Sequence, residues 1–346
     1  MIRFGIHDFR WGLPLLLIGL ASGCFRPESP LPLRSPAPDL NQLSVPLGTW
    51  IESLGTVTFG NQVYVDLGTG QQTIRSRQAW DLAFAFGEKA PAIFLNTANY
   101  AQAALVTGAS LGADLSPVRP TDYAFRFDSA SGGWDETVLA GWQDPLTGDS
   151  RQQLWLVDLG FDTLLMPRGF RQLVIDSLVG ERYYFRYALA DGGAIQSVVL
   201  PKNPETSLTY FSLERGEAVA VAPPDEAWDL VFTYYAYRYP DGIPYWLTGA
   251  LTNPYRVKAR EIPREAVEDL ALADTAIWGW AEGRDEIGFD WKEYLFGPPA
   301  RYETDTNRHY LLRDAEGLVY RLRFLDFYNA DGERGFPLME YAPVLP

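Results

Sequence analysis

Short stretches of alternating apolar and polar residues recur along the chain and predict β-strands. Every second residue is large and apolar in residues 80–86 and again in residues 228–232. Because successive side chains of a strand point to opposite faces, these stretches predict two strands that each bury one face in a core. Asp81 and Asp229 fall on the opposite faces, where a carboxylate can accept backbone N–H groups from an adjoining loop. Isolated acids rarely bind Ca²⁺, and we predict no metal site.

Turn signals separate these alternating runs. Asp-Leu-Gly-Thr-Gly at 66–70 and Asp-Ala-Glu-Gly at 314–317 are typical of hairpin turns. The runs 319–324 and 338–341 complete an antiparallel meander at the end of the chain. A short helix is expected to begin at Pro263. The 19 Tyr, 19 Phe, 31 Gly and 25 Pro favour strands and turns, and the fold class is therefore predicted to be all-β.

Two motifs occur twice, in the same order and at nearly the same spacing. Tyr-x-x-Leu-x-x-Gly stands at 64–70 and again at 210–216, and Ala-Trp-Asp-Leu-x-Phe stands at 79–84 and again at 227–232. A chance recurrence of common strand motifs is the alternative, but further matches follow in order. The repetition predicts two structural units of similar fold.

We therefore predict two tandem antiparallel β domains, each a sandwich or meander, at residues 45–202 and 203–346. Asn96 and Asn253 form a further pair between the two copies. A later match has a shorter offset and requires an insertion near 142–168 in the first copy.

Residues 1–23 are predicted to be a bacterial lipoprotein signal peptide. A basic start is followed by an apolar run too short to span a bilayer, and Ala-Ser-Gly stands directly before Cys24, the only cysteine. This order resembles a lipobox, in which lipid is attached to the cysteine thiol. An ordinary secretory peptide followed by a chance cysteine is the alternative. Residues 24–44 are rich in proline and are predicted to be a linker.

The expected location is the outer membrane, held by the lipid anchor at Cys24. Phe25 follows this cysteine, and no Asp stands there to signal retention in the inner membrane. Which face of the membrane carries the protein stays open. The net charge of −15 excludes a nucleic-acid partner, because such binding needs clustered Lys and Arg.

The repeated motifs, together with residues 287–292, 320–328 and 332–335, resemble the HmuY-like lipoproteins. The resemblance covers nearly the whole mature chain, twice, and is stronger in the second copy. It implies an all-β fold and an outer-membrane lipoprotein of Gram-negative bacteria. Founding members of that family bind haem and pass it to a TonB-dependent transporter. They hold the iron with two axial side chains, either two His or two Met.

Few residues of this chain could serve as haem ligands. After removal of the signal peptide, His309 is the only histidine, and Met166 and Met339 are the only methionines. Two histidines from one chain are therefore impossible, whereas a His–Met pair, a Met–Met pair or a Tyr ligand stays open. The structural alternatives are a half-exposed strand residue for His309, a core residue for Met339 and a gap filler for Met166.

An aromatic cluster at 234–246 is the most unusual local feature and is predicted to be a long hairpin. It has the composition of a recognition surface for a protein, a glycan or a flat porphyrin. The alternative is a pair of strands whose aromatics pack across the sheet. The residues proposed for recognition are Tyr234, Tyr235, Tyr237, Arg238, Tyr239, Tyr245 and Trp246.

We expect no enzyme, because a serine or cysteine hydrolase needs a base near its nucleophile, usually histidine, and the mature chain has one histidine and no thiol. No phosphate-binding glycine loop is present. Glycoside hydrolysis by a pair of carboxylates stays open as a third alternative. The predicted function is an outer-membrane-anchored binding lipoprotein for haem or another tetrapyrrole, which it delivers to a TonB-dependent transporter in iron acquisition at the cell surface. The alternative is a non-haem accessory lipoprotein that binds a protein or glycan partner through the aromatic hairpin of the second domain. Haem is the one cofactor considered.

Overall fold

The computed structural model describes residues 40–51, 56–87, 91–267 and 270–345. The predicted signal peptide, Cys24 and most of the proline-rich linker lie outside the described residues. The described part is all-β, as predicted: strands make up 44% of the described residues, and the helices are short 3-10 turns.

The first sandwich consists of a five-stranded sheet with the order β12-β11-β10-β9-β8 and a four-stranded sheet with the order β14-β13-β6-β7. The two sheets enclose one apolar core, in which Phe84 and Phe185 stack with ring centroids 5.0 Å apart. Its strands are β6 (Leu82–Ala85), β7 (Ile93–Leu95), β8 (Gln102–Val106), β9 (Leu154–Asp158), β10 (Phe170–Val179), β11 (Arg182–Leu189), β12 (Gln196–Pro201), β13 (Leu208–Ser212) and β14 (Glu217–Val219).

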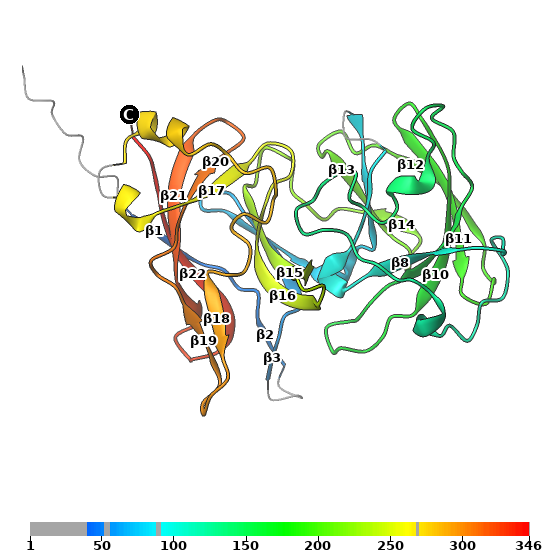
Figure 1. Cartoon of the computed structure of the whole chain (residues 1–346), viewed down its shortest axis with the longest axis horizontal. Coiled ribbons are helices and arrows are strands. Elements are labelled where there is room, and N and C mark those ends of the chain that lie inside the picture. Colours follow the sequence, from blue (N-terminus) through cyan, green and yellow to red (C-terminus); the bar gives the residue numbers. More distant parts are fainter. Residues whose placement is uncertain (1–39, 52–55, 88–90, 268–269, 346) are drawn as a thin grey trace, which may run out of the picture. The chain divides into compact units, whose positions relative to one another are not determined.

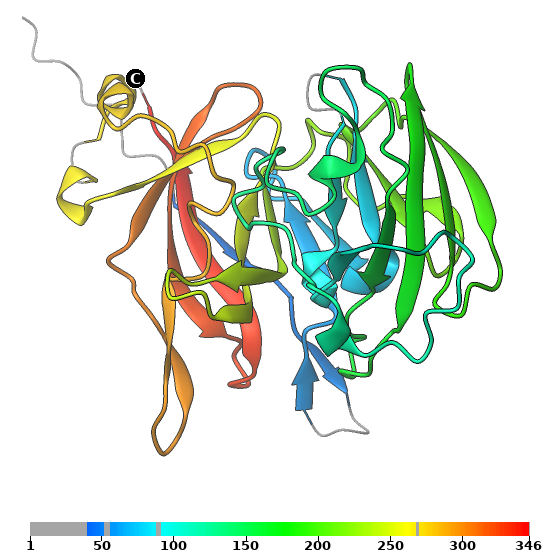
Figure 2. The same cartoon turned by 45° about the vertical axis from the view of Figure 1, so that its right-hand side comes forward.

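The second sandwich has the same plan. Its sheets have the orders β1-β22-β21-β20-β17 and β16-β15-β4-β5, and Phe232 and Phe324 meet in the core between them. Figures 1 and 2 show its five-stranded sheet mainly in orange and red. Its strands are β1 (Asn41–Ser44), β4 (Asn61–Val65), β5 (Gln72–Ser76), β15 (Leu230–Arg238), β16 (Pro244–Thr252), β17 (Lys258–Ile262), β20 (His309–Arg313), β21 (Val319–Tyr328) and β22 (Arg334–Pro343).

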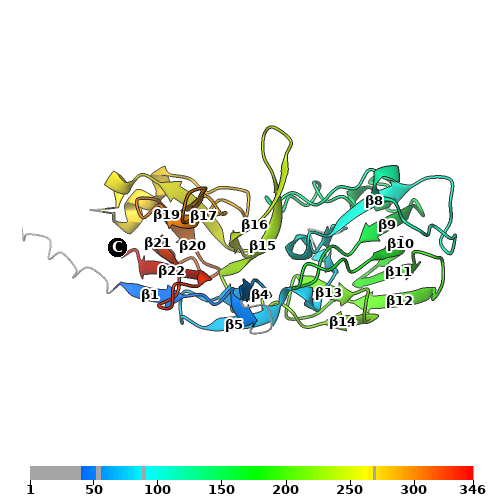
Figure 3. The same cartoon turned by 90° about the horizontal axis from the view of Figure 1, so that it is seen from below.

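The two copies of the repeat exchange their first hairpins. Hairpin β4-β5 belongs to the first copy but pairs with β15 of the second, where Val65 lies opposite Leu230. Hairpin β13-β14 belongs to the second copy but pairs with β6 of the first. Figure 3 shows β4 and β5 apart from β13 and β14. The sheets therefore do not follow the boundaries 45–202 and 203–346, which stay a prediction for the sequence repeat.

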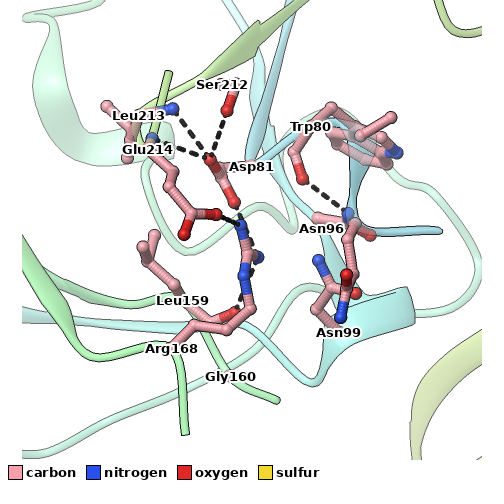
Figure 4. A network of polar contacts seen from close by, with 12 residues as sticks. Trp80, Asp81, Asn96, Asn99, Leu159, Gly160, Arg168, Ser212, Leu213 and Glu214 are labelled. Atoms are coloured by element: carbon pink, nitrogen blue, oxygen red, sulfur yellow. Dashed lines mark hydrogen bonds and ion pairs between the residues drawn. The ribbon is translucent and has the colours of Figure 1, made fainter. Parts of the chain in front are cut away.

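Asp81 and Asp229 hold these exchanged hairpins in the way that the sequence predicts for a carboxylate beside a loop. A carboxylate oxygen of Asp229 accepts the backbone N–H of Leu67 at 2.7 Å, and one of Asp81 accepts that of Leu213, also at 2.7 Å. Each aspartate thus fixes the turn that the other copy contributes. Figure 4 shows the Asp81 contacts.

A third apolar cluster packs the outer faces of the two four-stranded sheets together. It contains two edge-to-face aromatic pairs at equivalent positions of the two copies. The ring centroids are 4.9 Å apart in the pair of Tyr64 with Trp228 and 5.1 Å apart in the pair of Trp80 with Tyr210. The remaining elements connect the sheets. They are β2 (Thr49–Ile51), β3 (Thr56–Thr58), β18 (Lys292–Leu295), β19 (Arg301–Thr304), η2 (Arg77–Ala79), η4 (Thr97–Asn99), η5 (Pro120–Asp122), η6 (Ala140–Trp142), η7 (Arg264–Ala266) and η8 (Leu272–Ile277).

Three local predictions can be compared with these elements. The predicted linker ends too late, because residues 41–44 form β1 and Leu43 packs against the second core. The predicted insertion near 142–168 contains β9, which separates β8 from β10, whereas the second sandwich pairs β17 directly with β20. The predicted short helix is confirmed only at its start, because Pro263 is the N-cap of η7, which is a 3-10 turn of three residues that ends before Val267.

Candidate functional site

His309 is the first residue of β20 and lies on the outer face of the five-stranded sheet of the second sandwich. The next residue, Tyr310, points into the core, so the side chain of His309 points the other way. The segment with η7 and η8 covers part of this outer face (Figure 2). The position at a strand start agrees with the sequence prediction, but the expected half-exposure is wrong, because His309 is only 8% exposed.

His309 opens onto a shallow pocket of about 250 Å³ on this face. Arginines dominate its polar lining. Arg323 is paired with Glu340 at 3.0 Å, and Arg264 donates a hydrogen bond to Asn307 at 2.6 Å. The residues that line the pocket are Leu40, Arg264, Val267, His309, Arg321, Leu322, Arg323, Glu340 and Tyr341.

The surroundings of His309 keep its imidazole neutral. Burial lowers the pKa of His309 below its usual value, and the positive charges of Arg323, Arg264 and Arg321 lower it further. A neutral imidazole can coordinate iron through a ring nitrogen. Guanidinium groups present paired N–H donors that fit carboxylates. The pocket thus combines one metal-binding nitrogen, three guanidinium groups, of which that of Arg323 is already paired with Glu340, and an apolar wall.

The two methionines do not share this pocket. Met339 lies opposite Phe324 in the sheet and is fully buried in the second core, so it points away from the face that carries His309. Met166 lies in the loop between β9 and β10 of the first sandwich and is 60% exposed. Its backbone N–H donates to Asp162. The structure therefore assigns Met339 to the core and places Met166 on the surface.

The aromatic stretch 234–246 forms a hairpin, as predicted, and most of its rings pack within the protein. Strands β15 and β16 pair over their whole length, from Leu230 opposite Thr252 to Arg238 opposite Pro244. Tyr235 is buried, and Tyr237 contacts Phe289 at 5.1 Å. On the other face of the hairpin, the ring centroids of Tyr234 and Trp246 lie 4.7 Å apart. Most of this cluster therefore fits the alternative interpretation, in which the aromatic side chains pack within the protein.

Only the tip of this hairpin presents apolar side chains to solvent. Ile243 and Tyr245 are each 49% exposed, and Tyr239 packs against Tyr245 at 4.7 Å. Arg238 reaches the ring of Phe127, 4.9 Å from its centroid. Figure 3 shows the hairpin extending away from the sheets.

Sequence reasoning missed Arg77 and the basic wall around His309. Arg77 is 1% exposed and lies 5.1 Å from the ring centroid of Trp246, where its guanidinium donates to several backbone oxygens. Arg321 and Arg323 had a visible signal, because they alternate with Tyr320, Leu322 and Phe324 and must share the outer face. Arg264 carried no such signal, since only the fold brings it to this face.

Within the part of the chain that the structure describes, no group of three or more His, Cys, Asp or Glu side chains is arranged to hold a metal ion. Among the same residues, no helix has the length and apolar character to cross a membrane.

No family model matches the chain, and no curated protein matches it. Several solved structures are similar to it, among them the following three. A protein assigned as HmuY-like and heme-binding, from Bacteroides vulgatus, has 14% identity and a TM-score of 0.21, and the match covers 49% of this chain and 90% of that one. Apo PinO from Porphyromonas gingivitis has 7% identity and a TM-score of 0.28, and the match covers 88% of this chain and 97% of that one. A protein assigned as a lipoprotein, from Bacteroides fragilis, has 17% identity and a TM-score of 0.21, with 51% and 91% covered.

Proposed function

We propose that this chain is a lipid-anchored binding protein and that the His309 pocket takes haem or another tetrapyrrole with carboxylate side chains. The observation that carries the proposal is the position of His309, the only histidine among the described residues, in a pocket walled by Arg264, Arg321 and Arg323. The resemblance of residues 320–328 to the HmuY-like lipoproteins supports it, because this segment forms β21 and contributes two of these arginines.

The residues of the pocket fit part of such a ligand. Haem presents an iron that accepts axial nitrogen ligands, and its two propionates are carboxylates. His309 would supply one neutral axial nitrogen, and the guanidinium groups would hold the propionates. The pocket volume of about 250 Å³ is below the roughly 300–1,000 Å³ of typical ligand sites, so the macrocycle would rest with only one edge in the pocket. Neither methionine is placed to supply a second ligand here.

Titration of residues 25–346 with haemin tests the proposal. We expect a saturable, sharpened Soret band that His309→Ala abolishes and that Met166→Ala leaves unchanged, since Met166 lies on the surface of the other sandwich. Arg321→Gln is expected to weaken binding about tenfold, because a charge-assisted contact to a carboxylate contributes roughly 1.5 kcal/mol. Broad absorbance without saturation, or equal binding by His309→Ala, would contradict the proposal.

The membrane anchor and the transporter partner are further parts of this proposal. Labelling of cells with palmitate is expected to mark the wild-type chain and not Cys24→Ser. A lipid-anchored carrier would pass its ligand to a TonB-dependent outer-membrane transporter, and co-purification of such a barrel with the haem-loaded chain would support this step. Labelling of Cys24→Ser at the wild-type level would exclude the anchor at this residue.

The exposed tip of the β15-β16 hairpin favours a second candidate function, which is non-haem binding of a protein or glycan partner. The strands of this hairpin are part of the second sandwich, so a test must change the tip and leave the pairing intact. Ile243→Ser combined with Tyr245→Ser is expected to abolish capture of an outer-membrane barrel that persists after haem depletion. Unchanged capture by this double variant would remove the candidate.

A further inference from the structure

A cavity of about 90 Å³ lies where the outer faces of the two four-stranded sheets meet. Both copies of the repeat contribute equivalent residues to its lining, namely Tyr64 with Tyr210 and Trp80 with Trp228. Arg284, from the loop between η8 and β18, also lines the cavity and has no counterpart in these pairs. The cavity lies on the opposite side of β4 and β15 from the second core, and none of the residues around His309 lines it.

Five polar atoms of the residues that line this cavity are buried and have no hydrogen-bond partner among the described residues; three of them are nitrogen donors, and the other two are the hydroxyls of Thr233 and Tyr235. The three donors are the indole nitrogens of Trp80 and Trp228 and the amide nitrogen of Gln62. Trp228 and Gln62 are only 4% and 2% exposed. An indole N–H can only donate, and a buried donor without an acceptor costs roughly 1–3 kcal/mol. A molecule that supplies acceptor atoms would satisfy these donors.

Arg284 adds a positive charge to this set of donors. Its backbone is fixed by hydrogen bonds to Ser131 and Thr252, and its side chain passes so close to Gly132 that a Cβ added there would lie 2.6 Å from the Cδ of Arg284. The guanidinium donates to the carbonyl of Thr252 at 3.2 Å through Nε. Among the described residues, no carboxylate lies within ion-pair distance of it, although Asp285 is close enough to act on its charge.

The acid that lines the cavity does not compete for these donors. Asp128 accepts backbone N–H groups with both oxygens, from Leu95 at 2.6 Å and from Val138 at 2.7 Å. Burial raises the pKa of Asp128 to about 7, which reduces its negative charge near neutral pH. The cavity thus holds a cation and several unused donors, while its own carboxylate is already occupied.

We propose that this cavity binds a small oxyanion, such as acetate, phosphate or sulfate, between Arg284 and the indole N–H groups of Trp80 and Trp228. The volume sets the size limit, because about 150 Å³ is needed to hold benzene. A guanidinium with indole donors suits the oxygens of a carboxylate or phosphate, and burial strengthens these contacts. Since both sheets line the cavity, the bound anion connects the two sandwiches.

Calorimetric titration of residues 25–346 with acetate, phosphate and sulfate, at constant ionic strength in chloride, tests this inference. We expect saturable binding of at least one anion, at least tenfold weaker in Arg284→Gln and unchanged in the control Arg119→Gln, which alters an exposed arginine. Trp80→Phe keeps the ring and removes the N–H, and we expect it to weaken binding several-fold. This variant decides the question if Arg284→Gln fails to fold.

A crystal soaked in selenate gives the second measurement. An anomalous peak within hydrogen-bond distance of the Arg284 guanidinium would support the inference. Water alone in the cavity, no saturable heat with any of the three anions, or equal affinities of Trp80→Phe and wild type would overturn it. None of these results depends on haem binding at His309, so this site and the proposed function can fail separately.

Discussion

Asp81 and Asp229 occupy the same position in the two copies, yet their surroundings differ in charge. Asp81 is paired with the buried Arg168 at 2.8 Å (Figure 4). Asp229 has no basic partner of this kind among the described residues. Burial raises the pKa of Asp229 to about 7, and the negative charges of Asp314 and Asp66 add to the effect. The hydrogen bond to the exchanged turn is therefore accepted by an ion-paired carboxylate, Asp81, in one copy and by a carboxyl group without a basic partner, Asp229, in the other.

This difference predicts a pH dependence that belongs to Asp229. Its folded pKa of about 7 exceeds the unfolded value of about 3.9, so the folded state retains the proton that the unfolded state loses. The contribution of Asp229 to the free energy of unfolding should be fully present below pH 4, fall as the pH rises to about 7, and then level off. Asp229→Asn removes this contribution and is expected to be more stable than wild type at pH 8, by on the order of 2 kcal/mol. Urea unfolding at pH 5 and pH 8 measures it, and an equal response of both proteins to pH would contradict it.

The matched change in the first copy should act in the opposite direction. Asp81→Asn keeps the shape but leaves the guanidinium of Arg168, whose side chain is 5% exposed, without its buried partner. Loss of one partner of a buried pair costs about 3 kcal/mol, although the contact of Arg168 with Glu214 at 2.8 Å reduces the loss. Urea unfolding at pH 8 should therefore show Asp81→Asn destabilised and Asp229→Asn stabilised. Effects of the same sign would show that the two charge environments do not control stability.

At the scale of elements, alternation was sufficient to predict part of the strands. It identified β6 and β15, the hairpin at 234–246 and the meander at the end of the chain, because the side-chain period of two is a local property. The face that each aromatic ring occupies follows from the same period. A local pattern does not show which other element packs against each face of a strand. Tyr235 and Tyr237 were therefore proposed for recognition, although they pack against Phe289 and the third cluster.

The close approach of β16 to the loop before β18 depends on a glycine. Ala250 and Gly288 exchange two backbone hydrogen bonds, at 2.8 and 3.1 Å, and a Cβ added at Gly249 would lie 2.3 Å from the carbonyl oxygen of Gly288. Gly249→Ala is expected to lower the free energy of unfolding by about 1–3 kcal/mol, because the loop must move. Gly297→Ala is the control, since its Cβ would meet open space. Thermal unfolding of both variants measures the difference, and equal midpoints would contradict the contact.

At the scale of the whole molecule, the repeat was visible in the sequence but the exchange of hairpins was not. The motifs at 64–70 and 210–216 show that the elements occur in the same order in both copies. Each copy has its own first hairpin, so the sequence does not show that the hairpins are exchanged. Alternation shows that Val65 and Phe211 are buried but not in which sandwich. That choice rests on contacts between distant segments, such as Asp229 with Leu67. The full lining of the His309 pocket could not be predicted from the sequence for the same reason, because η7 brings Arg264 to it from another part of the chain.

The exchange makes each copy dependent on the other, which predicts how separated copies should behave. Residues 40–202 lack β13 and β14 and would expose the edge of β6, while their own β4-β5 hairpin has no sheet to join. An unpaired edge and an uncovered core favour association, and two identical copies can exchange their hairpins reciprocally. Light scattering should therefore find residues 40–202 as dimers or larger species when expressed alone. Co-expression with residues 203–346 should give a 1:1 complex, because each fragment then supplies the hairpin that the other lacks. Two stable, independent monomers would mean that each copy can close on its own hairpin, and that the exchanged arrangement is not required for folding.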